Sequence, residues 1–125
     1  MRLPGKLDLY LYRYAGFKLE TVFKDSNGTP INVTGYKGLL ECRPEPDSDV
    51  SIFRWTSAAS QQITFGTTNG LITISLTAAQ VIAGNYPVGE YFYDFYVQDG
   101  AGMLYPHLTG NFTVRNSNIR SAIDW

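Results

Sequence analysis

Apolar and polar residues alternate along most of this chain, which is the pattern of strands with one buried face. In Leu7–Tyr14 the odd-numbered leucines are predicted to face one way, and Asp8, Tyr10 and Tyr12 the other. The segment Phe17–Asp25 alternates in the same way. Further strands are predicted over Gly38–Arg43, Val50–Ser57, Gln61–Gly66, Leu71–Leu76, Glu90–Gln98 and Met103–Arg115.

Turn residues separate these strands. Asn27 and Gly28 accept positive φ at low cost and predict a reversal of the chain. The prolines and acidic residues of 44–49 cannot continue a strand ladder and predict a loop. The last strand is predicted to be bulged at Pro106 or Gly110.

One segment has a helical pattern. Thr77 is followed three residues later by Gln80, which is the spacing of a capping box. A short helical turn is therefore predicted over Thr77–Gly84, with Gly84 ending it.

Seven or eight short strands, with no long helices between them, predict an all-β fold. We expect an immunoglobulin-like antiparallel β-sandwich of two sheets with one short helical turn. The chain has 125 residues, 44% of them apolar, which suits a single domain. We expect the sandwich over residues 1–115 and a polar C-terminal tail over residues 116–125.

Charge and hydropathy exclude several classes of partner. The net charge is −1 and no basic run is present, so no nucleic-acid partner is expected. No segment approaches the ~20 apolar residues of a membrane-spanning helix, so no membrane partner is expected. The N-terminus lacks a signal-peptide pattern, and we expect the chain to act without Sec export.

Catalytic and metal-binding patterns are missing from the sequence. It contains no Gly-x-Ser-x-Gly motif and no phosphate-binding loop. The single cysteine, Cys42, lies in an apolar segment and is expected to be buried and unreactive. The single histidine, His107, is expected to be structural. We therefore predict no catalytic residue, no metal, no cofactor and no enzymatic activity.

The segment Glu90–Gln98 carries aromatic residues on both of its predicted faces. Tyr91, Tyr93, Phe95 and Val97 are predicted to fill the core. Phe92 and Tyr96 fall on the opposite face, as do Tyr10 and Tyr12 in the first strand. Large exposed apolar patches are uncommon on monomers. Either a partner covers these rings or another part of the same chain does, and both alternatives stay open here.

The tail adds two further apolar residues, Ile123 and Trp125. They are predicted either to anchor the chain on a neighbouring subunit or to fold back on their own sandwich. The candidate interface residues are Tyr10, Tyr12, Phe92, Tyr96, Ile123 and Trp125. Exposed rings also stack on sugars, so a carbohydrate-binding module is kept as an alternative.

Several phrases of the sequence, taken in order, resemble small structural proteins of tailed bacteriophages. They are FKLETVFKDSNGTPINVTGYKGLLECRP, then LITISL with the following LTAAQ turn, then GEYFYDFYVQDGAGMLYPHLTGNFTV. The resemblance extends over most of the chain, roughly from Tyr12 to Arg115. Similar domains stand at the N-termini of baseplate upper proteins of siphophages, where they attach a receptor-binding module to the tail.

The resemblance implies an immunoglobulin-like domain in a virion, without catalytic residues. This sequence has no coiled-coil stalk and no receptor-binding head, which favours a tail or baseplate adaptor. A capsid decoration protein on the phage head is the alternative. The implied partners are other virion proteins, in a homo-oligomeric or multi-copy assembly. The implied location is the virion, assembled in the host cytoplasm.

Overall fold

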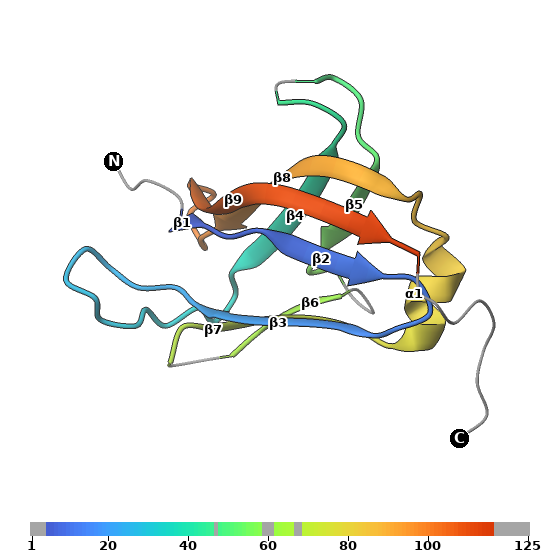
Figure 1. The fold of residues 1–125 in the computed structure, drawn as a ribbon. Helices are drawn as coiled ribbons and strands as arrows, with labels where there is room; N and C mark the ends of the chain where they lie inside the picture. The colour runs from blue at the N-terminus through green and yellow to red at the C-terminus, as the bar shows by residue number, and fades with distance from the viewer. Residues whose placement is uncertain (1–4, 47, 59–61, 67–68, 117–125) are drawn as a thin grey trace.

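Two β-sheets packed face to face make up the fold (Figure 1). The computed structural model describes residues 5–46, 48–58, 62–66 and 69–116. The elements are β1 (Gly5–Lys6), β2 (Leu9–Tyr12), β3 (Phe17–Val22), β4 (Lys37–Arg43), β5 (Phe53–Thr56), β6 (Ile63–Phe65), β7 (Leu71–Leu76), α1 (Ala78–Gly84), β8 (Gly89–Gln98) and β9 (Leu104–Arg115).

The larger sheet has the strand order β1-β9-β8-β4-β5, and β2 also pairs with β9. The smaller sheet has the order β3-β7-β6. β1 and β2 run parallel to β9, and the other pairings between described strands are antiparallel. The sequence did not predict this parallel pairing. Alternation shows which face a side chain takes, but not the direction of the neighbouring strand.

The strand order is that of an immunoglobulin-like sandwich. In chain order, β3 to β9 take the places of strands B, C, C′, D, E, F and G, which gives one GFCC′ sheet and one BED sheet. At the start of β8 the Tyr91 hydroxyl donates to the Pro87 carbonyl oxygen at 2.9 Å. This bond matches the tyrosine corner of that fold. The predicted all-β immunoglobulin-like class is confirmed.

The helix α1 forms at the predicted place, between β7 and β8 (Figure 1). The Thr77 hydroxyl oxygen accepts from the Gln80 N–H, and the Gln80 side chain accepts from the Thr77 N–H, which completes the capping box. The helix continues through Gly84, and Asn85 adopts the left-handed conformation at φ 46°. The helix therefore ends at Gly84 as predicted, but the left-handed residue that follows it is Asn85, because asparagine also tolerates this conformation.

An aromatic cluster from both sheets fills the middle of the sandwich. The ring of Trp55 in β5 lies 5.3 Å from that of Phe17 in β3 and 5.6 Å from that of Phe112 in β9, between centroids. All three residues are at most 9% exposed. Each such ring pair contributes about 0.5–1.5 kcal/mol beyond its buried area. The cluster therefore joins the smaller sheet to the larger one.

Three of the four residues of β8 predicted to face the core are buried: Tyr93, Phe95 and Val97. Tyr91 is only half-buried. Its ring lies at the beginning of the strand, where its hydroxyl donates to backbone carbonyl oxygens outside the core.

The bulge in β9 falls at His107. Phe95 is opposite Leu108 and the next residue, Tyr96, is opposite Pro106, so His107 is the extra residue. Its position is next to the predicted Pro106. The other predicted position, Gly110, is not the site of the bulge. A Cβ at Gly110 would lie 2.3 Å from the Leu7 carbonyl oxygen, which is too close. Glycine at this position lets the N-terminal segment approach β9.

The first strand is shorter than the predicted Leu7–Tyr14. Leu9 and Leu11 are buried as predicted, but Leu7 is 41% exposed. Leu7 lies between β1 and β2, where its N–H donates to the Thr109 carbonyl oxygen at 3.0 Å. The chain is not a regular strand at this residue, so the alternation that holds for β2 does not extend to it.

We expect Tyr86→Phe to lower the free energy of unfolding. The buried indole N–H of Trp55 donates to the Tyr86 hydroxyl at 3.0 Å and loses its acceptor in this variant. A buried donor left without a partner costs about 1–3 kcal/mol. Urea unfolding followed by tryptophan fluorescence measures the change. Tyr12→Phe, at a residue that is 49% exposed, is the matched control. Equal losses in both variants would contradict this role of the Tyr86 hydroxyl.

Candidate functional site

Four exposed aromatic side chains lie on the outer face of the larger sheet, the face that points away from the smaller sheet. Tyr10 and Tyr12 come from β2, and Phe92 and Tyr96 come from β8. Their exposed fractions lie between 39% and 49%. Their outward orientation is as predicted, whereas their role as interface residues stays a prediction.

The two other predicted interface residues, Ile123 and Trp125, lie outside the described residues. The predicted boundary at residue 115 coincides with Arg115, the last residue of β9. The assignment of residues 116–125 as a separate tail stays a prediction.

The four exposed rings do not form one patch. Tyr10 is opposite Thr113 of β9, which is opposite Glu90 of β8. Tyr96 lies six residues further along β8, which corresponds to about 20 Å of extended chain. The guanidinium carbon of Arg115 lies 5.9 Å from the centroid of the Tyr10 ring, so a cation approaches one face of that ring. The structure places the rings on one face but in separate groups.

A hollow of about 450 Å³ lies beside Tyr96, over β4 and β8. We call it the Tyr96 hollow. Its apolar lining includes Tyr96, Leu39 and Leu104, and Leu104 is 57% exposed. Its charged and polar lining residues are Lys37, Glu41, Arg43, Asp94 and Gln98. The hollow thus combines an apolar surface with charges of both signs.

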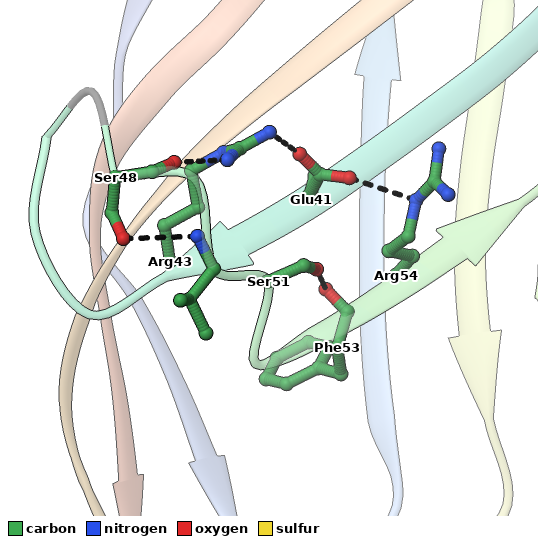
Figure 2. Close-up of polar contacts among 7 residues, drawn as sticks. Glu41, Arg43, Ser48, Ser51, Phe53 and Arg54 are labelled. Atoms are coloured by element: carbon green, nitrogen blue, oxygen red, sulfur yellow. Dashed lines mark hydrogen bonds and ion pairs between the residues drawn. The ribbon is translucent and has the colours of Figure 1, made fainter.

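Glu41 of β4 holds two arginines on this face (Figure 2). One carboxylate oxygen accepts from Arg43 on the same strand, and the other accepts from Arg54 Nε of β5 at 2.8 Å. The Arg43 guanidinium also donates to the Ser48 carbonyl oxygen, which ties the 44–49 loop to β4 (Figure 2). The Glu41 side chain is only 15% exposed, so solvent screens these ion pairs less than pairs on an open surface. The cluster fixes charged groups beside the Tyr96 hollow.

Sequence reasoning did not identify this ion-pair cluster. Glu41 and Arg43 alternate with the buried Leu40 and Cys42, so their outward orientation could have been inferred. Their partner Arg54 is opposite Glu41 only because of the register between β4 and β5. That register depends on the loop between the two strands, and alternation alone does not determine it.

Two more hollows continue along the same face. One of about 580 Å³ is lined by Phe92 and Asp94, and one of about 200 Å³ is lined by Phe92 and Tyr10. Asp94 also lines the Tyr96 hollow. Because neighbouring hollows share these residues, they form an adjoining series between Tyr96 and Tyr10.

The Tyr93 hydroxyl fastens the N-terminal segment to β8. It donates to the Leu7 carbonyl oxygen at 2.5 Å. Burial raises the pKa of this hydroxyl, and the nearby carboxylates of Asp8 and Asp94 raise it further. Tyr93 therefore stays protonated and keeps donating at neutral pH. This bond holds Asp8 on the same outer face as Asp94.

Cys42 and His107 both lie in the core. Cys42 is fully buried, as predicted. His107 is 6% exposed, and its Nε2 lies 3.0 Å from the Thr21 hydroxyl oxygen. The rings of Phe23 and Phe95 pack edge-on against the imidazole. These contacts place His107 among structural groups between the two sheets.

The described residues contain no group of three or more His, Cys, Asp or Glu side chains arranged to hold a metal ion. In the same part of the chain, no helix is long and apolar enough to cross a membrane.

Asp99 organises the turn between β8 and β9. One carboxylate oxygen accepts from the N–H groups of Met103 and Ala101, at 3.0 and 2.9 Å. The other oxygen accepts from the Tyr105 hydroxyl at 3.0 Å. The Met103 N–H, and then the other two donors, hold the pKa of the Asp99 carboxyl below its usual range. This turn positions Leu104 at the Tyr96 hollow.

No family model and no curated protein matches the chain. Among solved structures, it is similar to one from a photo-crosslinking study of multimeric cell-adhesive interactions of VGSC beta subunits. The TM-score is 0.41 and the identity 13%, over 92% of this chain and 96% of that chain. For murine CRIg the TM-score is 0.34 and the identity 15%, over 90% and 93%.

A third similar structure is the extracellular domain of the voltage-gated sodium channel beta4 subunit, described as forming parallel homodimers in cell-cell adhesion. Here the TM-score is 0.33 and the identity 10%, over 99% of this chain and 95% of that chain. With TM-scores below 0.5, these similarities carry no argument about function. The fold class rests on the strand order and the tyrosine corner.

We expect the Cys42 thiol to be unreactive while the protein is folded. Burial raises the pKa of this thiol to about 12, and the thiolate is the reactive form. A thiol reagent at pH 8 should leave the folded protein unlabelled and should label it fully in guanidinium chloride. Rapid labelling without denaturant would contradict the buried, protonated state.

The Asp99 carboxylate should make stability depend on pH. The pKa of this carboxyl is depressed in the folded protein. Its contribution to folding stability is therefore fully present above the usual aspartate pKa near 3.8, and it is lost as the pH falls through the pKa of the folded state. Asp99→Asn removes this titration. We expect the variant to lose less stability than the parent protein between neutral and acidic pH, measured as thermal midpoints. Parallel pH profiles for the two proteins would be the contrary result.

Proposed function

We propose that the chain is a non-enzymatic structural protein of a bacteriophage virion, a tail or baseplate adaptor that acts through protein–protein contacts. The main support is the Tyr96 hollow, where exposed apolar side chains lie beside charged groups held by ion pairs, on the outer face of the larger sheet. The resemblance of the sequence to phage structural proteins supports the placement in a virion.

The composition of the hollow suits a protein partner. Contact regions between proteins have an apolar centre and a polar rim. Leu104 and Tyr96 are 57% and 39% exposed and provide the centre. The Glu41 ion pairs hold Arg43 and Arg54 in defined positions at the side of the hollow. A partner therefore meets charged groups that are already ordered, which reduces the entropy lost on binding.

The carboxylates on this face support a binding role over a catalytic one. Both oxygens of Glu41 are engaged by arginines. Asp94 accepts from the Thr109 hydroxyl at 2.9 Å, and Asp8 accepts from the Asn111 N–H at 3.1 Å. Each of these carboxylates is thus already held by a partner within the protein, which suits a preformed contact surface.

A carbohydrate-binding module is the weaker alternative. Sugar stacking needs open aromatic faces at the spacing of the sugar rings. Here Tyr96 and Tyr10 lie at opposite ends of the series of hollows, and Arg115 approaches one face of the Tyr10 ring.

Purified phage particles from the host that carries the gene test the proposal. After separation of heads and tails, mass spectrometry should detect this chain in the tail fraction. Detection on the heads would instead identify a capsid decoration protein. Absence from both fractions would refute a virion role.

A variant of the hollow tests the surface itself. Leu104→Arg adds a charge and bulk at the centre of the proposed contact, so we expect its incorporation into particles to fall about tenfold or more. Thr64→Arg makes the same kind of change on the exposed side of the smaller sheet and should be incorporated normally. Equal incorporation of both variants would show that the partner contacts another surface.

A further inference from the structure

The smaller sheet ends in an open strand, β3. Within the described residues, β3 pairs only with β7, and its other edge has no neighbouring strand. β3 has six residues, whereas the other strands that border an open edge have at most four. Long open edges readily accept another strand, and proteins usually shorten or cover them.

The alternation of backbone hydrogen bonds along β3 shows which of its N–H and C=O groups lie at the open edge. The Phe23 N–H donates to the Gly70 carbonyl oxygen at 2.8 Å, so the odd-numbered residues of this segment bond toward β7. The N–H and C=O groups of Lys18, Glu20 and Val22 therefore point away from β7. Among the described residues, none bonds to these backbone groups, so a strand added there would find three residues with available donors and acceptors.

The core is also incompletely covered at this edge. Phe17 and Phe23, at the two ends of the segment, are 9% and 2% exposed. Leu19 and Thr21 lie between them and point to the same side, yet both are only half-buried. An additional strand with apolar inward side chains would cover Leu19.

The sequence contains a matching segment near its C-terminal end. In residues 119–125 the odd positions are Ile119, Ser121, Ile123 and Trp125. The even positions are Arg120, Ala122 and Asp124. This alternation of apolar and polar residues is the pattern of a strand with one buried face.

One antiparallel register matches both faces of β3. It places Ile123 opposite Leu19 and Asp124 opposite Lys18, with Ala122 opposite Glu20. On the inner side, Trp125 is then opposite Phe17 and Ser121 opposite Thr21. The neighbouring registers are less favourable, because cross-strand pairs of like charge are destabilising and apolar pairs are stabilising. A shift of two residues in one direction places Asp124 opposite Glu20, which have like charges. A shift of two in the other direction loses the apolar pair by placing Ser121 opposite Leu19, and a shift of four in that direction places Arg120 opposite Lys18, again with like charges.

The segment in this register has to come from another copy of the chain. Arg115 lies at the Phe17 end of β3, because its carbonyl oxygen accepts from the N–H of Arg13 in the turn between β2 and β3. In the matched register Ile119 lies near Phe23, at the other end, about 20 Å away. Even fully extended, the four residues 116–119 reach only about 14 Å from Arg115. A chain's own segment cannot reach this position.

We propose that residues 119–125 of a second copy add to the open edge of β3 as an antiparallel strand, with Asp124 opposite Lys18. This inference rests on the proposed structural role, since it names one contact by which copies of the chain join. A reciprocal exchange gives a closed dimer, and a one-way exchange gives a longer chain of copies.

Two full-length variants test the contact. Glu20→Pro removes an N–H from the open side of β3 while leaving the ladder to β7 intact. Ile123→Arg disrupts the added strand without altering the described sandwich. Light scattering after gel filtration should give at least twice the single-chain mass for the parent protein and the single-chain mass for each variant. An equimolar mixture should form a one-to-one complex, because each variant supplies what the other lacks.

Charge reversal tests the register. Lys18→Glu places a carboxylate opposite Asp124, and we expect the dissociation constant to rise about tenfold. Adding Asp124→Lys should restore it. Lys24→Glu is the matched control, because position 24 is opposite the neutral Asn118 in this register. We expect this control to assemble like the parent protein.

Three results would overturn the proposal: a monomeric parent protein, a mixture of the two variants that stays monomeric, and a charge reversal that the second change does not rescue. A monomer whose melting temperature falls in Ile123→Arg would show that the segment covers its own sandwich. None of these results would remove the chain from phage particles, so mass spectrometry of the particles still decides the proposed function separately.

Discussion

The contact between Trp55, Phe17 and Phe112 is the interaction on which the rest of the structure depends. These rings come from β5, β3 and β9, so they hold both sheets at once. Because the inner faces of the strands pack around this cluster, the alternation of side chains along each strand places every second side chain on the outer face. The exposed Phe92 and Tyr96 are a direct result, since they alternate with the buried Tyr93 and Phe95 on β8.

Much of this arrangement could be predicted from local pattern. The period of two assigned Tyr93, Phe95 and Val97 to the core, and the spacing of Thr77 and Gln80 predicted the helix with its cap. These features depend on residues that are close in sequence. The half-buried state of Tyr91 was missed, because it depends on a hydroxyl that bonds to backbone at the corner before β8.

Features that depend on pairing between distant segments could not be predicted. The parallel alignment of β2 with β9 joins two segments that are far apart in the sequence, and neither strand specifies the direction of the other. The ion pair between Glu41 and Arg54 depends on the register of β4 and β5. The Tyr96 hollow arises where β4, β8 and the start of β9 meet. The exposed rings were therefore predicted one by one, whereas the site around them became visible only in three dimensions.

The parallel pairing of the first and last strands has a mechanical consequence. Residues Leu9 to Tyr12 lie alongside Phe112 to Arg115, and both strands run in the same direction. A pull applied between Gly5 and Arg115 acts along these strands in opposite senses, so it loads their shared hydrogen bonds together in shear. Rupture then requires several bonds to break at once, whereas a hairpin pulled from its open end separates one bond at a time. The sandwich is therefore expected to resist tension applied between Gly5 and Arg115.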